Sequence, residues 1–505
     1  MKKTELYPTY SSSFELDYLE KKTDQLLIWI PVILLIALTL PFIAGDYWSD
    51  EIFSMMISRS WSGMQEYFRN YENNMSLYYV TLHGWIKVFG DGEAATHSLS
   101  LLYASFTLPV FYTLARVWFN KSTALLSSIL LAGNPLFVFY SLEVRSYSML
   151  ILASVISTLI FVRLARKPGL GLAIGYGLSV IIATYIHYFG ILLILVHALT
   201  IPWRKMTRSQ IRFFLISVCV ILSGILPLLL FPQQNKSQVD WLTKPDLKYL
   251  WYTLKDLVGG GYDFLVLLFC LFVVVKKGLW KYATDNEVFL RRLALAWTLV
   301  PTILLFAFSY LEKPVFLTRY FVWCVPGAVL LTSLIISYTG WNYKLKSFVW
   351  LFLSIIMLYR SYVFLHLRGS GYKDAVRYLN QTVMPGESVL VYPYYKTSHV
   401  SYYLGKMHSP NPFVKPSPIT RGVYLAGGGG KDPDPDMEKV NEVAGNTGKI
   451  YLVTREIWDS PLADSIQNRV WLPEIQKIIL RKHPKQQKMV FGAGTLDPLR
   501  VVVYE

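Results

Sequence analysis

The sequence is poor in charged residues and in cysteine. Only 16% of its 505 residues are Asp, Glu, Lys or Arg, whereas 53% are hydrophobic. Soluble domains carry about 25% charged residues, so this composition excludes an ordinary water-soluble protein. Cys219, Cys270 and Cys324 all lie inside apolar runs, where cysteine behaves as a small hydrophobic residue. Their positions exclude a disulfide framework or a cysteine-based metal site.

The sequence predicts neither a cleavable signal peptide nor a nucleotide-binding loop. Residues 1–24 are largely polar, so the first apolar run is expected to stay in the chain. Gly427–Gly430 has neither the Lys-Ser/Thr tail of a phosphate loop nor G-x-G-x-x-G spacing, and it predicts a flexible loop. The net charge of +16 does not indicate nucleic acid, because Lys and Arg cluster between apolar runs.

Long apolar runs are abundant. Most span about 16 to 20 residues, close to the length that crosses a ~30 Å hydrocarbon core. They predict a polytopic α-helical membrane protein with about eleven transmembrane helices. The runs lie at roughly 25–44, 96–115, 122–141, 147–162, 169–186, 188–203, 213–232, 262–275, 293–310, 320–338 and 347–366.

Basic residues predict the orientation in an inner or plasma membrane. Lys and Arg are enriched on the cytoplasmic side of membrane proteins, and here they recur at every second junction. The N-terminus is therefore expected in the cytoplasm and, with an odd number of spans, the C-terminus outside. The clusters are Lys2, Lys3, Lys21 and Lys22; Arg116 and Lys121; Arg163, Arg166 and Lys167; Arg204, Lys205, Arg208 and Arg212; Lys276, Lys277, Lys281, Arg291 and Arg292; and Lys344 and Lys346.

Composition suggests three parts: a cytoplasmic segment (1–24), a membrane domain (25–367) with an outer loop at 45–95, and an outer soluble domain (368–505). The last part alternates strands and helices, which is typical of an α/β sandwich. A second outer loop, 232–262, ends in Gly259–Gly261 and is interpreted as a lid with a flexible end. In the soluble part, helices are expected at 373–383, 396–404, 436–443 and 473–481, and strands at 388–392, 423–426, 449–454, 488–491 and 499–504.

The first outer loop places two carboxylates, Asp50 and Glu51, side by side. Ser49 would cap a helix beginning at Asp50, and acidic residues suit the first turn of a helix, so a structural role is one interpretation. Catalysis is the other. Two short amphipathic helices are expected in this loop, at 51–61 and 77–89, and the second carries His83 and Lys87.

Polar residues gather at three further outer junctions. Taken singly, each residue can be explained by a structural role, either in the aromatic belt at the membrane interface or as a cation that extends to the interface. Together they suit the phosphate of a lipid-linked ligand, because guanidinium groups bind phosphate in a bidentate way at the depth where lipid phosphates lie. The residues are Glu143, Arg145 and Tyr147; His187 and Tyr188; and Lys313, Arg319 and Tyr320.

The ordered motifs resemble a known family. They are DE at 50–51, N-x-x-LYY at 74–79, FGDGE at 89–93, LARVWF at 114–119, NP at 134–135, YSLEVRSY at 140–147, HYF at 187–189 and RY at 319–320. This pattern resembles the bacterial dolichyl-phosphate-mannose protein mannosyltransferase-like family of the GT-C superfamily, which also includes the lipid A aminoarabinose transferases. The resemblance covers about residues 25–370.

The resemblance implies an inverting glycosyltransferase that moves a hexosyl (for example mannosyl) or pentosyl group from a polyprenyl-phosphate donor to an acceptor hydroxyl at the outer face. It implies Asp50 as the base and Glu51 in support. It assigns Arg145, Arg319, Tyr320, Lys313 and His187 to the donor phosphate, with Glu143, Tyr147, Asn74, His83 and Lys87 supporting. The implied partners are the lipid-linked donor, membrane lipid and a glycan, lipid or protein acceptor.

Two departures from the family pattern concern the acceptor side. Asn74, Met75 and Ser76 replace the prolines that usually precede LYY, and Thr96 and His97 stand where an arginine usually follows FGxxE. Three alternatives stay open. One is a polymerase or ligase that uses lipid-linked glycans, another is a non-enzymatic lipid or glycan transporter, and the third adds a divalent metal at Asp50, Glu51 and Glu143.

Overall fold

The computed structural model divides the chain into two compact units. The membrane unit comprises Met1–Ile43 and Ile57–Leu365, and the C-terminal unit comprises Ala44–Met56 and His366–Glu505. The first part of the outer loop, with Asp50 and Glu51, therefore groups with the end of the chain. The residues described are 26–70, 73–230, 242, 244–384, 386–392, 399–404, 423–425, 437–455, 472–493, 495 and 498–505.

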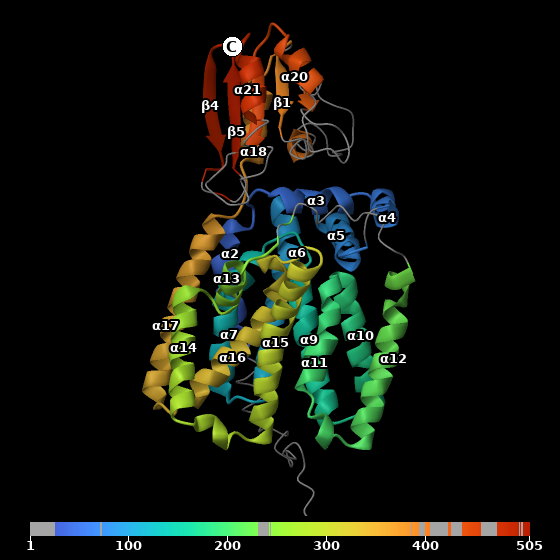
Figure 1. Cartoon of the computed structure of the whole chain (residues 1–505), viewed down its shortest axis with the longest axis vertical. Coiled ribbons are helices and arrows are strands. Elements are labelled where there is room, and N and C mark those ends of the chain that lie inside the picture. The colour runs from blue at the N-terminus through green and yellow to red at the C-terminus, as the bar shows by residue number, and fades with distance from the viewer. Residues whose placement is uncertain are drawn as a thin grey trace, which may run out of the picture. The chain divides into compact units, whose positions relative to one another are not determined.

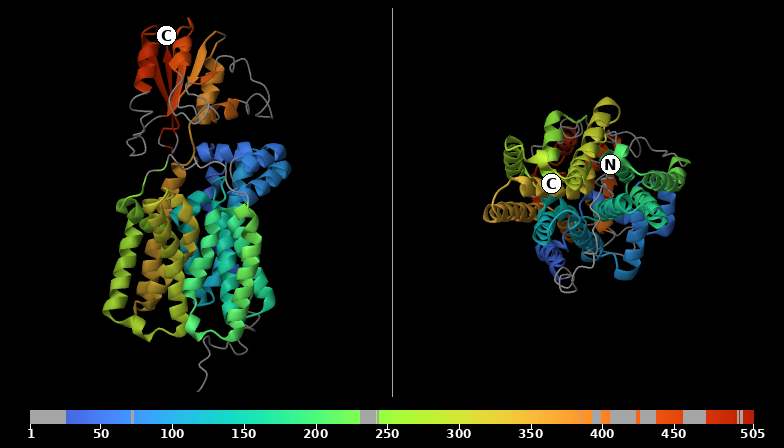
Figure 2. Two further views of the ribbon diagram at one scale, coloured as in Figure 1. Left: turned by 45° about the vertical axis from the view of Figure 1, so that its right-hand side comes forward. Right: turned by 90° about the horizontal axis from the view of Figure 1, so that it is seen from below.

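The membrane unit is built of helices that run side by side (Figures 1 and 2). Every one of the eleven predicted apolar runs contains a helix, and the prediction of a polytopic helical membrane protein is confirmed. The helices are α2 (Ile30–Thr39), α4 (Trp61–Asn70), α5 (Ser76–Phe89), α6 (Glu93–Ala115), α7 (Lys121–Gly133), α8 (Pro135–Tyr140), α9 (Tyr147–Arg166), α10 (Leu170–Ile186), η2 (Tyr188–Ile191), α11 (Leu192–Thr200), α12 (Arg208–Leu230), α13 (Leu247–Leu257), α14 (Gly261–Lys276), α15 (Asp285–Leu311), η6 (Thr318–Cys324), α16 (Val325–Tyr338) and α17 (Tyr343–His366).

Length and hydropathy identify the helices able to cross a membrane. Six described helices are long and apolar enough, and the bent pair α13 and α14 forms a seventh candidate. Four shorter apolar helices, at Ile30–Phe42, Lys121–Gly133, Leu170–Ile186 and Tyr188–Thr200, occupy the remaining predicted runs. The number of spans, about eleven, stays a prediction.

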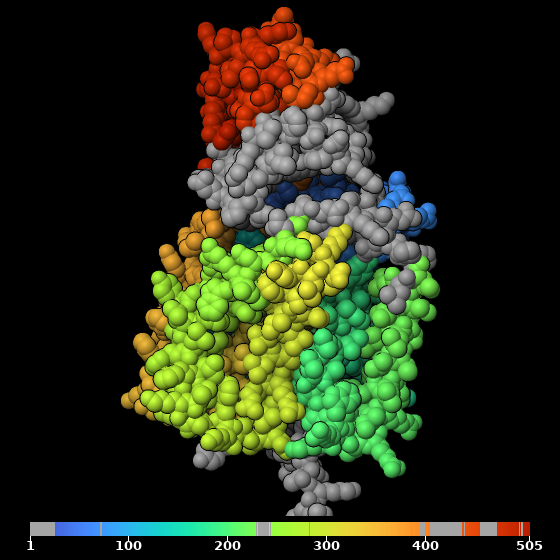
Figure 3. Space-filling view, viewed as in Figure 1, coloured from blue at the N-terminus to red at the C-terminus, as the bar shows by residue number. Residues whose placement is uncertain are grey.

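Large apolar side chains cover the outside of this bundle, as lipid contact requires. On the face shown in Figure 3, α12 (green), α14 (yellow-green) and α15 (yellow) present such residues to the surroundings. They include Leu215, Leu222, Leu265, Phe269, Phe272, Ile303 and Phe308. An integral membrane protein follows from this surface and from the candidate spans.

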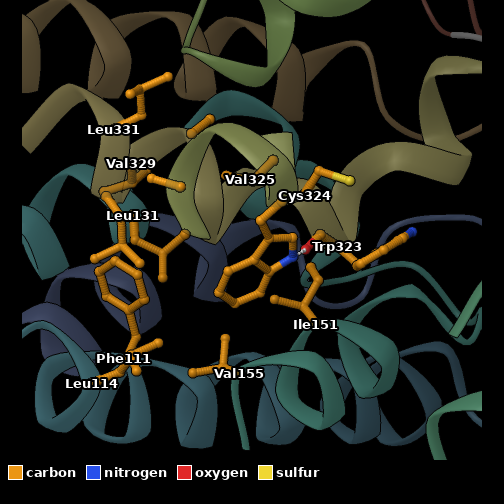
Figure 4. Close-up of a cluster of buried hydrophobic side chains, with 14 of the residues drawn as sticks. Phe111, Leu114, Leu131, Ile151, Val155, Trp323, Cys324, Val325, Val329 and Leu331 are labelled. Atoms are coloured by element: carbon orange, nitrogen blue, oxygen red, sulfur yellow. Dashed lines mark hydrogen bonds between the residues drawn. The ribbon is translucent and has the colours of Figure 1, made fainter. Parts of the chain in front are cut away.

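The core of the membrane unit surrounds η6 and α16. Trp323, Val325 and Val329 pack against side chains of α6, α7 and α9, among them Phe111 and Leu131 (Figure 4). Since α16 is almost wholly buried, it forms the centre of the bundle. This core fixes η6, which carries Arg319 and Tyr320, against the start of α9.

Some local features differ from the predictions. In the predicted outer loop 45–95, α3 (Ser49–Ser58) and α5 correspond to the two expected helices, whereas α4 lies in a stretch for which no helix was predicted. The second outer loop contains α13, which is bent by 81° from α14. Gly259 and Gly260, at φ of 119° and 133°, make this break, so the expected flexible end is a sharp bend. The sequence predicted no broken helix, whereas α13 and α14 form a broken helix pair.

The C-terminal unit contains a five-stranded mixed sheet in the order β2-β1-β3-β5-β4 (Figure 1). The parallel pairs are β1 with β2 and β1 with β3, and β5 is antiparallel to both of its neighbours. The predicted α/β domain is confirmed. The elements are α18 (Tyr372–Thr382), β1 (Ser388–Val391), β2 (Val423–Leu425), α20 (Met437–Ala444), β3 (Ile450–Arg455), α21 (Leu472–Leu480), β4 (Gln486–Phe491) and β5 (Leu499–Tyr504).

Both faces of this sheet are buried at its centre. Leu390 and Leu452 pack with α20 and α21, while Val389 and Val453 point to the opposite face and are also buried. Residues 399–404 are helical, as expected for the end of the predicted 396–404 helix. Gly427–Gly430 and the basic residues 2, 3, 21 and 22 lie outside the described residues.

Packing at the centre of the bundle gives a first prediction. A Cβ at Gly327 in α16 would lie 2.7 Å from the Cβ of Trp297, whose indole donates to the Trp323 carbonyl (3.0 Å). We expect Gly327→Ala to lower stability by about 1–3 kcal/mol through overpacking, measured by thermal unfolding in detergent. Gly175→Ala in α10 is the control, because its Cβ meets nothing within 4 Å. Equal melting temperatures for both variants would contradict this packing.

Candidate functional site

Six polar residues from three separate parts of the chain meet in the membrane unit, and we call them the polar cluster: Arg145, Ser146, Tyr147, His187, Arg319 and Tyr320. Tyr147 begins α9, His187 joins α10 to η2, and Arg319 and Tyr320 lie in η6. The rings of Tyr147 and His187 are 6.4 Å apart, and those of His187 and Tyr320 are 5.7 Å apart. The structure therefore brings together Arg145, Tyr147, His187, Arg319 and Tyr320, which the sequence had predicted to serve one site, and adds Ser146.

The local sequence explains why Arg145 and Tyr147 point into this cluster. Asn134 and Pro135 end α7 and begin α8, with the Asn134 carboxamide accepting from two backbone N–H groups of α8. α8 stops after Tyr140, and the backbone N–H of Arg145 turns back to the Glu143 carbonyl (2.7 Å). This tight turn places the arginine immediately ahead of α9.

Two arginines dominate the electrostatics of the cluster. The positive charges of Arg319 and Arg145 both act on the Tyr147 hydroxyl, and Arg145 also acts on His187. The Arg319 guanidinium lies 5.7 Å from the ring of Tyr320. Both arginines are half-buried, and their combined positive charge favours a negatively charged ligand.

His187 enters this cluster as a neutral imidazole. Burial, reinforced by the charge of Arg145, lowers the pKa of His187 to about 3. Its Nδ1 accepts a hydrogen bond from the Phe189 backbone N–H (3.2 Å), so the proton of the neutral ring lies on Nε2. His187 therefore supplies an N–H donor and no charge, unlike the arginines beside it.

Three buried polar groups of the cluster have no hydrogen-bond partner in the part of the chain that the structure describes. They are the Ser146 hydroxyl, the Tyr147 hydroxyl and Nε2 of His187. Almost all buried polar groups in proteins are paired, so three orphans in one place indicate an external partner with several acceptor oxygens. A phosphate has this chemistry.

Tyr79 belongs to the LYY motif, which predicted no role for its side chain. Its hydroxyl accepts a hydrogen bond from Nη1 of Arg145 (3.3 Å), and its side chain is fully buried. Ser146 was also missed, because a single serine beside a charged motif carries no distinctive pattern. The available signals were the LYY motif for Tyr79 and the E-x-R-x-Y spacing around Ser146.

The altered turn before α5 is built without proline. Met75 takes the left-handed conformation (φ 63°), and the Asn74 carboxamide accepts from the Tyr188 backbone N–H (3.1 Å). Asn74 thus holds the segment next to His187, consistent with the supporting role assigned to it. His97, at the other departure, is buried with Nδ1 2.7 Å from the Ile43 carbonyl oxygen.

Other predicted residues lie elsewhere. His83 contacts the Ser58 carbonyl oxygen (2.7 Å) and the ring of Trp61, and Lys87 is exposed. Lys313 lies between α15 and η6 and is half-buried. Glu143 is buried beside the cluster, where its charge acts on Tyr147 and its carbonyl accepts from the Ser100 hydroxyl (2.5 Å).

Asp50 and Glu51 lie in the first turn of α3, within the C-terminal unit. The helix begins at Ser49, one residue before the predicted start, so Ser49 is not the residue ahead of the helix. Glu51 acts at this helix start instead: its Oε2 accepts from the Trp48 N–H (3.2 Å). Glu51 is fully buried and Asp50 is half-buried.

No group of three His, Cys, Asp or Glu side chains suited to a metal ion occurs among the described residues. Glu51 is instead paired with Arg368, with 2.5 Å between Oε1 and Nη2. These residues therefore give no support for a metal held by Asp50, Glu51 and Glu143.

Comparison with known proteins agrees with this architecture. The chain is similar to the crystal structure of ArnT from Cupriavidus metallidurans in the apo state, with a TM-score of 0.54 at 14% identity over 96% of this chain and 98% of that one. The chain has the GT-C fold. The resemblance stated from the ordered motifs is thereby confirmed.

Two further comparisons cover nearly the whole chain and part of it, respectively. ArnT from Cupriavidus metallidurans bound to undecaprenyl phosphate is similar to this chain with a TM-score of 0.53 at 13% identity, over 96% of this chain and 98% of that one. The family described as dolichyl-phosphate-mannose-protein mannosyltransferase matches residues 77–231, which include Arg145, Tyr147 and His187. No curated protein sequence matches the chain.

The low pKa of His187 gives a second prediction. An ordinary histidine, with a pKa near 6.5, gains a proton in the unfolded chain as pH falls, but folded His187 stays neutral down to about pH 3. Stability is therefore lost as pH falls below 6.5, by roughly 2 kcal/mol at pH 5 from this residue. The melting temperature of His187→Asn should fall less between pH 7.5 and 5 than that of the native chain. An equal fall would contradict a neutral, buried His187.

Proposed function

We propose that this protein is a membrane glycosyltransferase that takes a sugar from a polyprenyl-phosphate donor and transfers it, with inversion, to an acceptor hydroxyl at the outer face of the membrane. The observation that carries the proposal is the polar cluster. Two arginines, an imidazole N–H and two hydroxyl groups converge there inside an apolar helical unit. Such a set suits a phosphate whose lipid tail lies among apolar helices.

The cluster acts on the leaving group in this proposal. As the acceptor oxygen attacks the anomeric carbon, the bond from that carbon to the donor phosphate oxygen breaks and the electron pair stays with the phosphate. Arg145 and Arg319 stabilise the added negative charge, while the Tyr147 hydroxyl and Nε2 of His187 donate hydrogen bonds. Tyr320 and Lys313 belong to the same donor side.

Asp50 is the base in this proposal. Its carboxylate accepts the proton of the acceptor hydroxyl while that oxygen attacks, which gives one in-line displacement and inversion. Glu51 supports Asp50 by fixing the start of α3. The N-terminus is cytoplasmic and the C-terminal unit lies outside, as the basic clusters predict.

The comparisons support the donor class. The similar ArnT structure contains undecaprenyl phosphate, which is a polyprenyl phosphate, and the matching family is described by a lipid-phosphate-linked sugar donor.

Donor turnover tests the proposal. Purified protein is supplied with a panel of polyprenyl-phosphate sugars carrying hexoses or pentoses, and donor consumption is compared with that of Asp50→Asn. We expect Asp50→Asn to lose at least about 10²-fold in kcat, the contribution typical of a general base. The matched control is Glu66→Gln, an exposed carboxylate on α4, with native turnover expected.

Two outcomes would overturn parts of this proposal. Full activity of a correctly folded Asp50→Asn protein would refute Asp50 as the base. No turnover of any donor by the native chain, together with binding of the lipid phosphate, would favour a transporter. Products longer than one added sugar would instead indicate a polymerase or ligase.

A further inference from the structure

We infer that the C-terminal unit positions the catalytic segment of the chain, and that Arg368, acting through Glu51, is a positioning residue for Asp50. The inference rests on the proposed role of Asp50 as base. Its starting point is the grouping of Ala44–Met56 with His366–Glu505 in one compact unit. The segment that carries the base is thus built into the C-terminal unit, although it precedes that part of the chain by more than 300 residues.

The central contact is an ion pair between Arg368 and Glu51. Nη2 of Arg368 lies 2.5 Å from Oε1 of Glu51, and the two side chains are 4% and 0% exposed. The second carboxylate oxygen of Glu51 accepts from the Trp48 N–H at the start of α3. One carboxylate therefore joins the first turn of the helix to Arg368.

Three more hydrogen bonds fix the backbone on the N-terminal side of Asp50. The Tyr403 hydroxyl accepts from the Tyr47 N–H (2.9 Å), and the Ser370 hydroxyl donates to the Tyr47 carbonyl (2.7 Å). The Ser49 carbonyl lies 3.2 Å from Nε2 of His399, which can donate to it. These contacts hold residues 47 and 49 while Glu51 is held from the other side.

Aromatic packing stiffens the same contacts. Tyr47 is fully buried and its ring lies 6.1 Å from that of Tyr402. The rings of Tyr372 and His399 stack at 5.3 Å, and the Tyr372 hydroxyl is 3.4 Å from the Ser49 hydroxyl. Asp50 thus lies between residues fixed on both sides, as general-base catalysis requires of a residue that must meet one proton in one geometry.

The energetics of the ion pair favour a positioning role over a purely stabilising one. Burying two charges costs about as much as their attraction returns, so a buried pair adds little net stability compared with apolar residues of the same shape. The pair nevertheless constrains the orientation of both side chains, because each buried charge is stable only when it is paired and its remaining polar atoms are hydrogen-bonded. A pair retained directly beside a candidate base is explained by the orientation it imposes.

The test compares Arg368→Gln with the native chain in donor turnover, in the pH dependence of kcat and in binding of undecaprenyl phosphate. We expect kcat to fall about tenfold to hundredfold, as displacement of a catalytic group by about 1 Å does, with lipid binding within twofold of native. Loss of the positive charge should also shift the acid limb of the kcat profile to higher pH, because a guanidinium beside carboxylates favours their ionised form. Arg368→Lys, which keeps the charge, should recover part of kcat and is used alone if Arg368→Gln does not fold.

The control is Arg377→Gln. Arg377 forms an exposed ion pair with Asp374 on α18 (2.7 Å), and its loss should leave kcat and the pH profile unchanged. A native kcat and an unshifted acid limb in folded Arg368→Gln would refute the positioning role, as would a native kcat in Arg368→Lys if Arg368→Gln does not fold. Full activity of Asp50→Asn would instead refute Asp50 as the base. Failure of the positioning role and failure of the base assignment are therefore distinguishable.

Discussion

Burial of polar groups inside an apolar helical bundle is the constraint on which the membrane unit depends. A guanidinium or an imidazole removed from water needs charged or polar neighbours, since an uncompensated polar group costs several kcal/mol in such surroundings. The residues just ahead of α9 and η2, together with η6, bring Arg145, His187 and Arg319 to one place. Three hydroxyl and N–H groups of this cluster are unpaired among the described residues, which favours an external hydrogen-bond partner such as a phosphate.

The two units divide the work of the proposed reaction. The membrane unit supplies groups suited to the phosphate of a lipid donor, whereas the C-terminal unit holds the helix that carries Asp50. The Glu51 carboxylate connects this helix to the rest of the C-terminal unit, because it caps the start of α3 and also pairs with Arg368. The interpretations of the adjacent carboxylates as a cap and as a site are therefore compatible: Glu51 takes the structural task beside Asp50.

Sequence patterns predicted the helices, the strands and the motif residues, because these depend on local periodicity and on the order of residues along the chain. Apolar runs predicted helices at α6, α9 and α15, and alternating segments predicted all five strands of the C-terminal sheet. The E-x-R-x-Y and RY motifs predicted residues that the fold brings together. Strand order was not predictable, because the pairing of β1 with β2 and β3 is decided by tertiary packing.

The ion pair of Arg368 and the bend at Gly259 were not predicted, because each depends on a contact between residues far apart in the sequence. Arg368 looked only like a domain boundary, since its partner Glu51 is 317 positions away and no local pattern marks such a pair. Three successive glycines permit both a flexible segment and a fixed bend, so the sequence does not distinguish the two. In the structure the guanidinium of Arg360 donates to the Gly259 carbonyl (2.6 Å) and fixes the bend.

Photolabelling with an undecaprenyl phosphate analogue, carrying a photoreactive group beside the phosphate, tests most directly whether the polar cluster binds a lipid phosphate. The account predicts label on peptides containing residues 143–147, 187–189 or 318–320, displaced by unlabelled undecaprenyl phosphate. It also predicts at least about tenfold weaker labelling in Arg319→Gln, as loss of a charged hydrogen bond implies, and native labelling in Arg69→Gln, an exposed arginine on α4. Label confined to other helices, or unchanged in Arg319→Gln, would contradict the account.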